Sequence, residues 1–197
     1  MRRITAIAVL WAGTAMGATT QLGLLGVMTL GGTDGVDRGS LASPNPYSGN
    51  TSFGGGVMIR GAGNPFFNLE LNALYAPRKY AFAGGGQATF PMLEIPLMLR
   101  FTPIPLLAFG FGGYYAVKIG DVSTTGTLPA AYNPPTFGTH DYGLVGAAGL
   151  QLPFGPMMAF LLEARFLMGL ADLDPSLVGV LKVRQWEFVG GFLFKIP

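Results

Sequence analysis

Eight segments of alternating residues are the feature that most restricts how this chain can fold. In each segment, apolar side chains alternate with polar or small ones, a pattern typical of strands with two different faces. No stretch after the N-terminal region has the roughly 20 uninterrupted apolar residues that a membrane-spanning helix needs. The segments lie at about 20–30, 52–61, 66–76, 90–102, 106–119, 140–152, 157–169 and 184–196.

The connections between these segments alternate between long and short. Long polar connections occupy 31–51, 77–89 and 120–139, and a medium one occupies 171–183. Between them lie tight turns at Gly63-Asn64, at Pro103-Ile104-Pro105 and at 153–156. Outer-membrane barrels have short periplasmic turns and longer external loops. The sequence therefore predicts an all-β fold, an eight-stranded antiparallel up-and-down transmembrane β-barrel.

The charged residues of each segment fall on one parity, as a barrel wall requires, except Arg184, which lies at a strand end. In Phe90–Phe101, Glu94 and Arg100 occupy even positions, and large apolar residues occupy the odd ones. An eight-stranded barrel is just wide enough for side chains to fill, so inward charges must pair with one another. We expect a lumen network of five cations and five anions: Arg60, Glu70, Glu94, Arg100, Lys118, Asp141, Glu163, Arg165, Glu187 and Lys195.

Two further expectations concern the strand walls. Aromatic residues near the loop ends of the strands predict an interfacial girdle. Pro96 lacks a backbone donor, so we expect a local bulge or a skipped hydrogen bond beside it. The predicted girdle residues are Tyr75, Phe90, Tyr115, Tyr142 and Trp186.

Composition tests the main alternative, a soluble β-barrel or sandwich. Only 11% of the residues are charged and 50% are hydrophobic. A solvated face would carry more charge than this, since soluble domains have roughly a quarter of their residues charged. Cys is absent, so the domain is held together without disulfides.

The N-terminal residues have a pattern typical of a secretory signal peptide. Arg2-Arg3 precedes an apolar run, Ile4 to Ala12, which is followed by small residues suited to cleavage. We predict a cleaved segment at 1–17 and a barrel domain at 18–197, the alternative being an N-terminal anchor. Of 12 Lys and Arg, two lie in the signal, so ten remain against ten Asp and Glu. No basic patch suited to nucleic acid remains.

Three stretches resemble a known family. Leu93-Glu94-Ile95-Pro96-Leu97 is similar to the fourth strand of the outer-membrane β-barrel domain family, the porin-like and PorT-like small barrels of Gram-negative bacteria. Residues 163–173 resemble its arginine-aromatic run, and 140–152 its Gly-rich sixth strand. The resemblance spans about 20–196 and implies an outer-membrane location without shared catalytic residues. The C-terminal strand departs from the usual insertion signal, because the chain ends in Pro197 rather than an aromatic residue.

No catalytic or metal site is expected. The single histidine, His140, has lipid-facing parity, but a lipid deacylase would need Ser where Tyr142 stands. Asp34, Asp37, Asp172 and Asp174 could bind Ca²⁺ between loops, although solvated carboxylates are the commoner state. We predict neither an enzyme nor a cofactor.

The lumen and the loops leave three functions open. The first is a structural anchor with a charge-filled, poorly conducting lumen, and the second is a narrow passive pore. The third is recognition of an external protein through loops 31–51 and 120–139. Expected partners are outer-membrane lipid, lipopolysaccharide and the barrel-assembly machinery.

Overall fold

The structure, a computed structural model, describes residues 20–37, 48–62, 66–82, 85–104, 106–128, 138–173 and 179–196. The predicted signal segment 1–17 and the turn at Gly63-Asn64 lie outside these residues. Cleavage of the signal therefore stays a prediction. Within the described ranges, no helix is long and apolar enough to cross a membrane.

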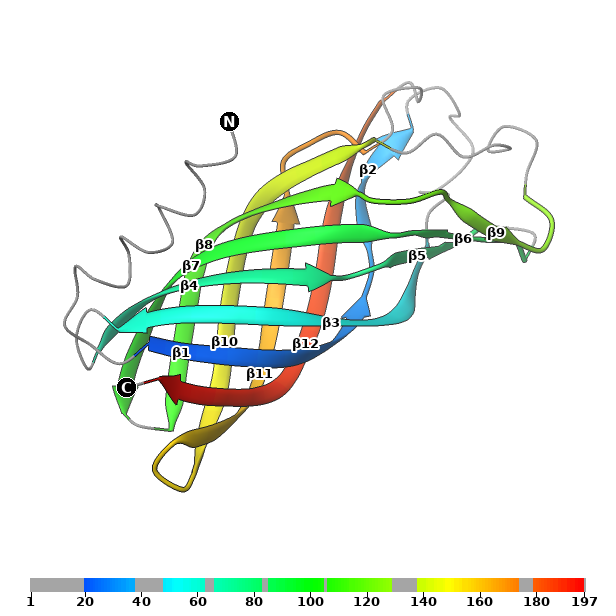
Figure 1. Cartoon of the computed structure of the whole chain (residues 1–197). Helices are drawn as coiled ribbons and strands as arrows, with labels where there is room; N and C mark the ends of the chain where they lie inside the picture. Colours follow the sequence, from blue (N-terminus) through cyan, green and yellow to red (C-terminus); the bar gives the residue numbers. More distant parts are fainter. Residues whose placement is uncertain are drawn as a thin grey trace, which may run out of the picture.

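Eight antiparallel strands form a closed barrel (Figure 1). Closure is shown by β1, which pairs along its whole length with β12 on one side and with β3 on the other. Each predicted segment corresponds to one of these strands, so the predicted fold is confirmed. The barrel strands are β1 (Thr20–Leu30), β3 (Ser48–Ala62), β4 (Phe67–Tyr75), β7 (Met92–Ile104), β8 (Leu107–Lys118), β10 (His140–Phe154), β11 (Met158–Gly169) and β12 (Gly179–Ile196).

Four short strands extend the barrel at its loop end, where the sequence predicted loops. β2 (Thr33–Asp37) pairs with the start of β12. β5 (Arg78–Ala81), β6 (Gln87–Phe90) and β9 (Ser123–Thr125) form an outer sheet on the first residues of β3. The loop prediction was wrong here because alternate side chains of β5 and β6 remain buried, so pairing continues past the membrane wall.

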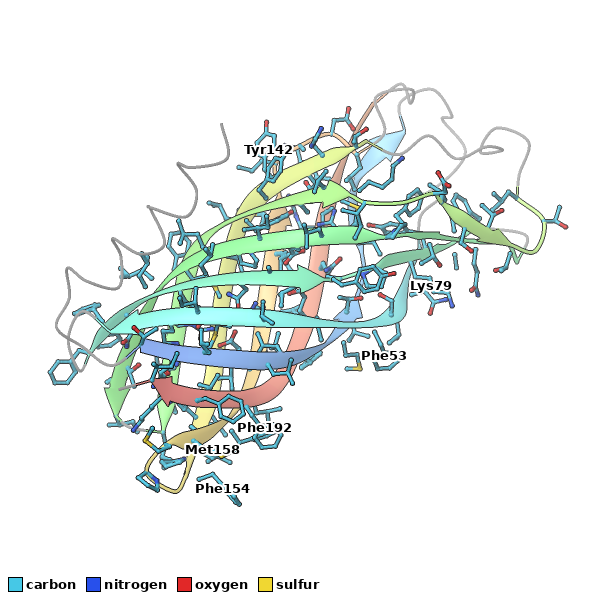
Figure 2. All side chains as sticks on the ribbon, viewed as in Figure 1. Phe53, Lys79, Tyr142, Phe154, Met158 and Phe192 are labelled. Carbon is cyan, nitrogen blue, oxygen red and sulfur yellow. The ribbon has the colours of Figure 1, made fainter. Side chains whose placement is uncertain are left out.

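The two faces of the barrel wall differ as the alternation predicts. Large apolar side chains point outward, and Figure 2 shows Phe53, Phe154 and Phe192 directed away from the barrel. Phe53 is 71% exposed, and many other outward Leu, Phe and Tyr side chains are also exposed. Since such a surface is stable only against hydrocarbon, the barrel spans a membrane.

Pro96 interrupts one strand ladder without changing its register. The β4–β7 pairing runs from Phe67↔Phe101 to Leu71↔Leu97 and resumes at Leu74↔Glu94. The two pairs opposite Pro96 and Ile95 are missing, which is the skipped bonding expected of a residue without an N–H. The register shift on this strand lies elsewhere, between Phe101 and Ile104 against β8.

Inward glycines allow the tight curvature of the wall. A Cβ atom on Gly112 would lie 2.0 Å from the carbonyl oxygen of Leu97 on the neighbouring strand. Gly56 is equally restricted, because its Cβ would lie 2.1 Å from the oxygen of Ala73. These contacts are backbone contacts, so only glycine allows the neighbouring strands to approach this closely.

This crowding gives a prediction with a matched control. Gly112→Ala should destabilise the barrel because the methyl group forces two strands apart. Gly146→Ala should leave it unchanged, since a Cβ there meets nothing within 4 Å. The measurement is the temperature at which the compact, heat-modifiable form is lost on a gel. Equal temperatures for the two variants would contradict the argument.

Candidate functional site

The half of the barrel nearer the short turns contains a dense ion network, here the turn-side cluster of Arg60, Glu70, Arg100, Glu163 and Arg165. Its centre is Glu70 on β4, which is fully buried. Oε2 of Glu70 accepts from Nε and Nη2 of Arg60, at 3.0 and 2.8 Å. Oε1 accepts from Nη2 of Arg100 at 2.9 Å and from Nη2 of Arg165 at 3.3 Å. One carboxylate thus holds three guanidinium groups.

Several of these contacts cross the lumen. Arg165 on β11 reaches Glu70 on β4, and these strands have three strands between them in either direction around the barrel. Nη1 of Arg60 on β3 donates to Oε1 of Gln151 on β10 at 2.7 Å, again between opposite strands. Glu163 on β11 binds Arg100 on β7 and also accepts from Nε of Arg165 at 2.5 Å. The bridges therefore cross the lumen in more than one direction.

A second group lies nearer the loops, here the loop-side cluster of Arg78, Glu94, Asp141 and Glu187. Nη1 of Arg78 lies 2.7 Å from Oδ2 of Asp141, and its Nη2 lies 3.6 Å from Oε2 of Glu94. The hydroxyl of Tyr114 donates to the same Asp141 oxygen at 2.7 Å. All four charged side chains are buried. The strand β5, outside the barrel proper, therefore supplies the cation that meets the wall carboxylates.

Sequence reasoning missed Arg78 because it follows Pro77 in a predicted loop. Alternation offered a signal: Arg78, Tyr80 and Phe82 share a parity, and all three are buried. Two predicted members do not belong to the network. Lys195 is exposed at the turn-side mouth, and Lys118 is half-buried. Neither lysine takes part in an ion pair among the described residues.

The described interior thus contains four buried arginines and five buried carboxylates, rather than five of each. The prediction is wrong for Lys195 because this residue is at the last inward position of its strand, where the barrel opens to solvent. The remaining predicted charges do lie inside: Arg60, Glu70, Glu94, Arg100, Asp141, Glu163, Arg165 and Glu187.

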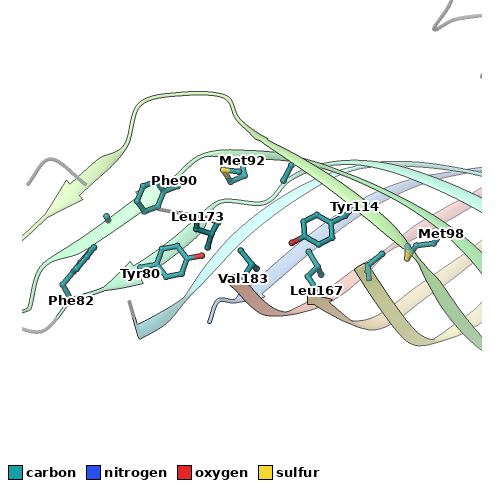
Figure 3. Close-up of a cluster of buried hydrophobic side chains, with 12 residues drawn as sticks. Tyr80, Phe82, Phe90, Met92, Met98, Tyr114, Leu167, Leu173 and Val183 are labelled. Atoms are coloured by element: carbon teal, nitrogen blue, oxygen red, sulfur yellow. The ribbon is translucent and has the colours of Figure 1, made fainter. Parts of the chain in front are cut away.

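An apolar cluster that includes Tyr114, which is hydrogen-bonded to Asp141, continues from the barrel into the outer sheet (Figure 3). Tyr80 and Phe90, from β5 and β6, pack edge to face with ring centroids 5.9 Å apart. Phe90 was predicted in the outward girdle and is instead fully buried. The reason is its even parity, shared with Met92 and Glu94 across Pro91. Burial also raises the pKa of Tyr80 to about 12.

The other four girdle residues do face outward near the loop end. Tyr75, Tyr115, Tyr142 and Trp186 are each about half exposed. His140 joins them: its Nδ1 lies 2.5 Å from the Tyr115 hydroxyl, and the two rings stack at 5.7 Å. A histidine in this setting contributes to the interfacial band.

Comparison with solved structures identifies the architecture. The chain is similar to the outer membrane protein OprG from Pseudomonas aeruginosa, with a TM-score of 0.60 and 16% identity over 94% of this chain and 98% of that one. The fold is that of a small outer-membrane β-barrel.

Two further solved barrels are similar in the same way. Outer membrane protein W of E. coli has a TM-score of 0.51 and 16% identity, covering 91% of this chain and 98% of that one. Neisserial surface protein A has a TM-score of 0.51 and 11% identity, covering 90% and 97%. No family model and no curated relative matches the chain. At these identities the likeness establishes the fold alone.

The chemistry of the site is electrostatic. Among the described residues, no group of three or more His, Cys, Asp or Glu is arranged to hold a metal ion. The loop carboxylate Asp174 and the side chains of Asp34 and Asp37 lie outside what the structure describes, so calcium binding there stays a hypothesis. The absence of catalysis likewise stays a prediction.

The central position of Glu70 gives a second prediction. Glu70→Gln keeps the side chain's size but leaves three buried guanidinium groups with one fewer anion. Removing one partner of a buried ion pair costs about 3–5 kcal/mol. We expect a loss of this order in the free energy of unfolding, measured by urea titration of protein folded in vesicles. Lys195→Gln, at an exposed lysine on the same wall, should change it by less than about 0.5 kcal/mol. Similar losses in both variants would exclude a special role for Glu70.

Proposed function

We propose that this protein is a non-conducting anchor of the outer membrane, in which a closed barrel holds an ordered sheet beyond the lipid. The contact between Arg165 and Glu70 carries this proposal. It joins opposite strands through the middle of the lumen and is fully buried at both ends.

Energetics support a sealed interior. A hydrated ion that crosses the barrel must separate the Arg60–Glu70, Arg100–Glu163 and Arg165–Glu70 pairs, or part of them. Each guanidinium or carboxylate left unpaired in a buried site costs several kcal/mol. The apolar clusters next to these pairs occupy the remaining inner wall, with Leu74 and Leu161 fully buried.

The outer sheet supports the anchoring part of the proposal. β5 and β6 are tied to the barrel by buried aromatic packing and by Arg78, so the sheet is packed onto the end of the wall. The apolar outer band would contact outer-membrane lipid and lipopolysaccharide, with Tyr115, Tyr142 and Trp186 at the outer interface. Insertion by the barrel-assembly machinery belongs to the same proposal.

The cross-lumen contacts bear on the narrow passive pore, the main alternative. A pore requires a continuous hydrated path, whereas the turn-side cluster bridges opposite strands. Recognition of an external protein fits the same anchored sheet, because β9 at its edge has three exposed residues, Ser123 to Thr125.

Electrical recording of the refolded protein in planar bilayers tests the proposal. We expect no steady conductance from the unaltered protein. The double variant Arg100→Ala with Glu163→Ala removes one cation and one anion, and with them the Arg100–Glu163, Arg100–Glu70 and Arg165–Glu163 pairs. It should introduce measurable conductance. Lys195→Ala serves as the control, since this side chain lies at the exposed mouth. Steady ion-selective conductance of the unaltered protein would overturn the anchoring proposal in favour of the pore.

A further inference from the structure

The guanidinium of Arg78 lies in a setting built for an organic cation. Asp141 and Glu94 approach it from two barrel strands, at 2.7 and 3.6 Å. Its Cζ atom lies 6.0 Å from the centroid of the Tyr114 ring, within the range of a cation–π contact. The two carboxylates and the aromatic ring form a buried cation site. Arg78, a residue of the chain itself, occupies it.

That occupant uses only part of the site. Neither the Nη1 nor the Nη2 group of Arg78 is aligned for a hydrogen bond, although both lie in ion-pair range. Both oxygens of Glu94 and Oδ1 of Asp141 have no hydrogen-bond partner among the described residues. Buried acceptors without donors are rare and costly, so each requires an explanation.

Further unpaired acceptors lie on β12. Gln185 donates its Nε2 to Oε1 of Glu187 at 2.8 Å, which leaves Oε1 of Gln185 and Oε2 of Glu187 without a donor. Both side chains are fully buried. Glu187 interacts electrostatically with both Arg78 and Arg165, but Arg165 is already bound to Glu163 and Glu70. Arg78 therefore has two carboxylates in ion-pair range, Asp141 and Glu94, while Glu187 lies opposite Arg165 in the β11–β12 ladder.

The spacing of these acceptors favours a nitrogen cation over a metal ion. A divalent metal needs several oxygens at roughly 2.0–2.6 Å from one point, and no described group of acids offers that arrangement. A guanidinium instead presents a planar fork of N–H donors and an ammonium a compact set of three, and both tolerate aromatic faces. Separated carboxylates beside Tyr114 match the second class.

We propose that the loop-side cluster is a binding site for small organic cations with a guanidinium or primary amine group, and that Arg78 is its intramolecular occupant. The recognising groups are Asp141, Glu94 and the Tyr114 ring. A free cation that displaces Arg78 frees the base of β5. Occupancy inside the barrel is thereby coupled to the position of the outer sheet. This site is separate from the cross-lumen contacts that seal the turn-side half.

Chemical rescue tests the site with methylguanidinium as the probe. Arg78→Ala, folded in vesicles and checked by heat-modifiable gel migration, should unfold at a lower temperature than the unaltered protein. Millimolar methylguanidinium chloride should recover much of that loss, whereas the same concentration of NaCl should not. Calorimetric titration should show at least about tenfold weaker binding to the unaltered protein, because Arg78 competes for the site.

Control variants keep the test decisive. Arg78→Ala combined with Asp141→Asn and Glu94→Gln retains the empty space but lacks the carboxylates, so rescue and binding should disappear. Arg78→Met replaces Arg78→Ala if the smaller side chain prevents folding. Equal stabilisation by methylguanidinium and NaCl would overturn the proposal. Rescue that persists without the two carboxylates would overturn it as well. Neither result affects the conductance test of the anchor.

Discussion

The structure depends on one constraint: every arginine inside a narrow membrane barrel must pair with an anion. Glu70 meets this constraint for three of them at once, through both of its oxygens. Because those arginines come from β3, β7 and β11, a single carboxylate fixes the relative position of strands far apart around the barrel. The same carboxylate also accepts a hydrogen bond from Nδ2 of Asn72 at 2.9 Å.

The alternation of residues along each strand gives the outer and inner faces of the barrel different side chains. The outward parity supplies apolar side chains to lipid, and the inward parity supplies ions, small residues and apolar filler. Glycines at Gly56 and Gly112 let the sheet curve tightly enough to bring opposite strands within the reach of arginine side chains. An alanine at either position would clash with the backbone of the neighbouring strand.

Alternation alone made most of the barrel predictable, because a period of two places each residue on one face. Pro96 followed the same rule, and the chemistry of its missing N–H indicated the gap in the ladder. The even parity of Arg78 and Phe90 was visible in the sequence, but it became informative only once β5 and β6 were known to pair beyond the membrane. Lys195 has the correct parity but the wrong depth. Depth depends on where the wall ends, which alternation does not encode.

The bridges between opposite strands have a consequence for how the barrel is assembled. Glu70 belongs to the first half of the chain and Arg165 to the second, so neither charge has this partner in a half-inserted, open sheet. The first and last strands, β1 and β12, form the seam. An incomplete sheet therefore lacks the Arg165–Glu70 contact, which can form only when both halves of the barrel are in place.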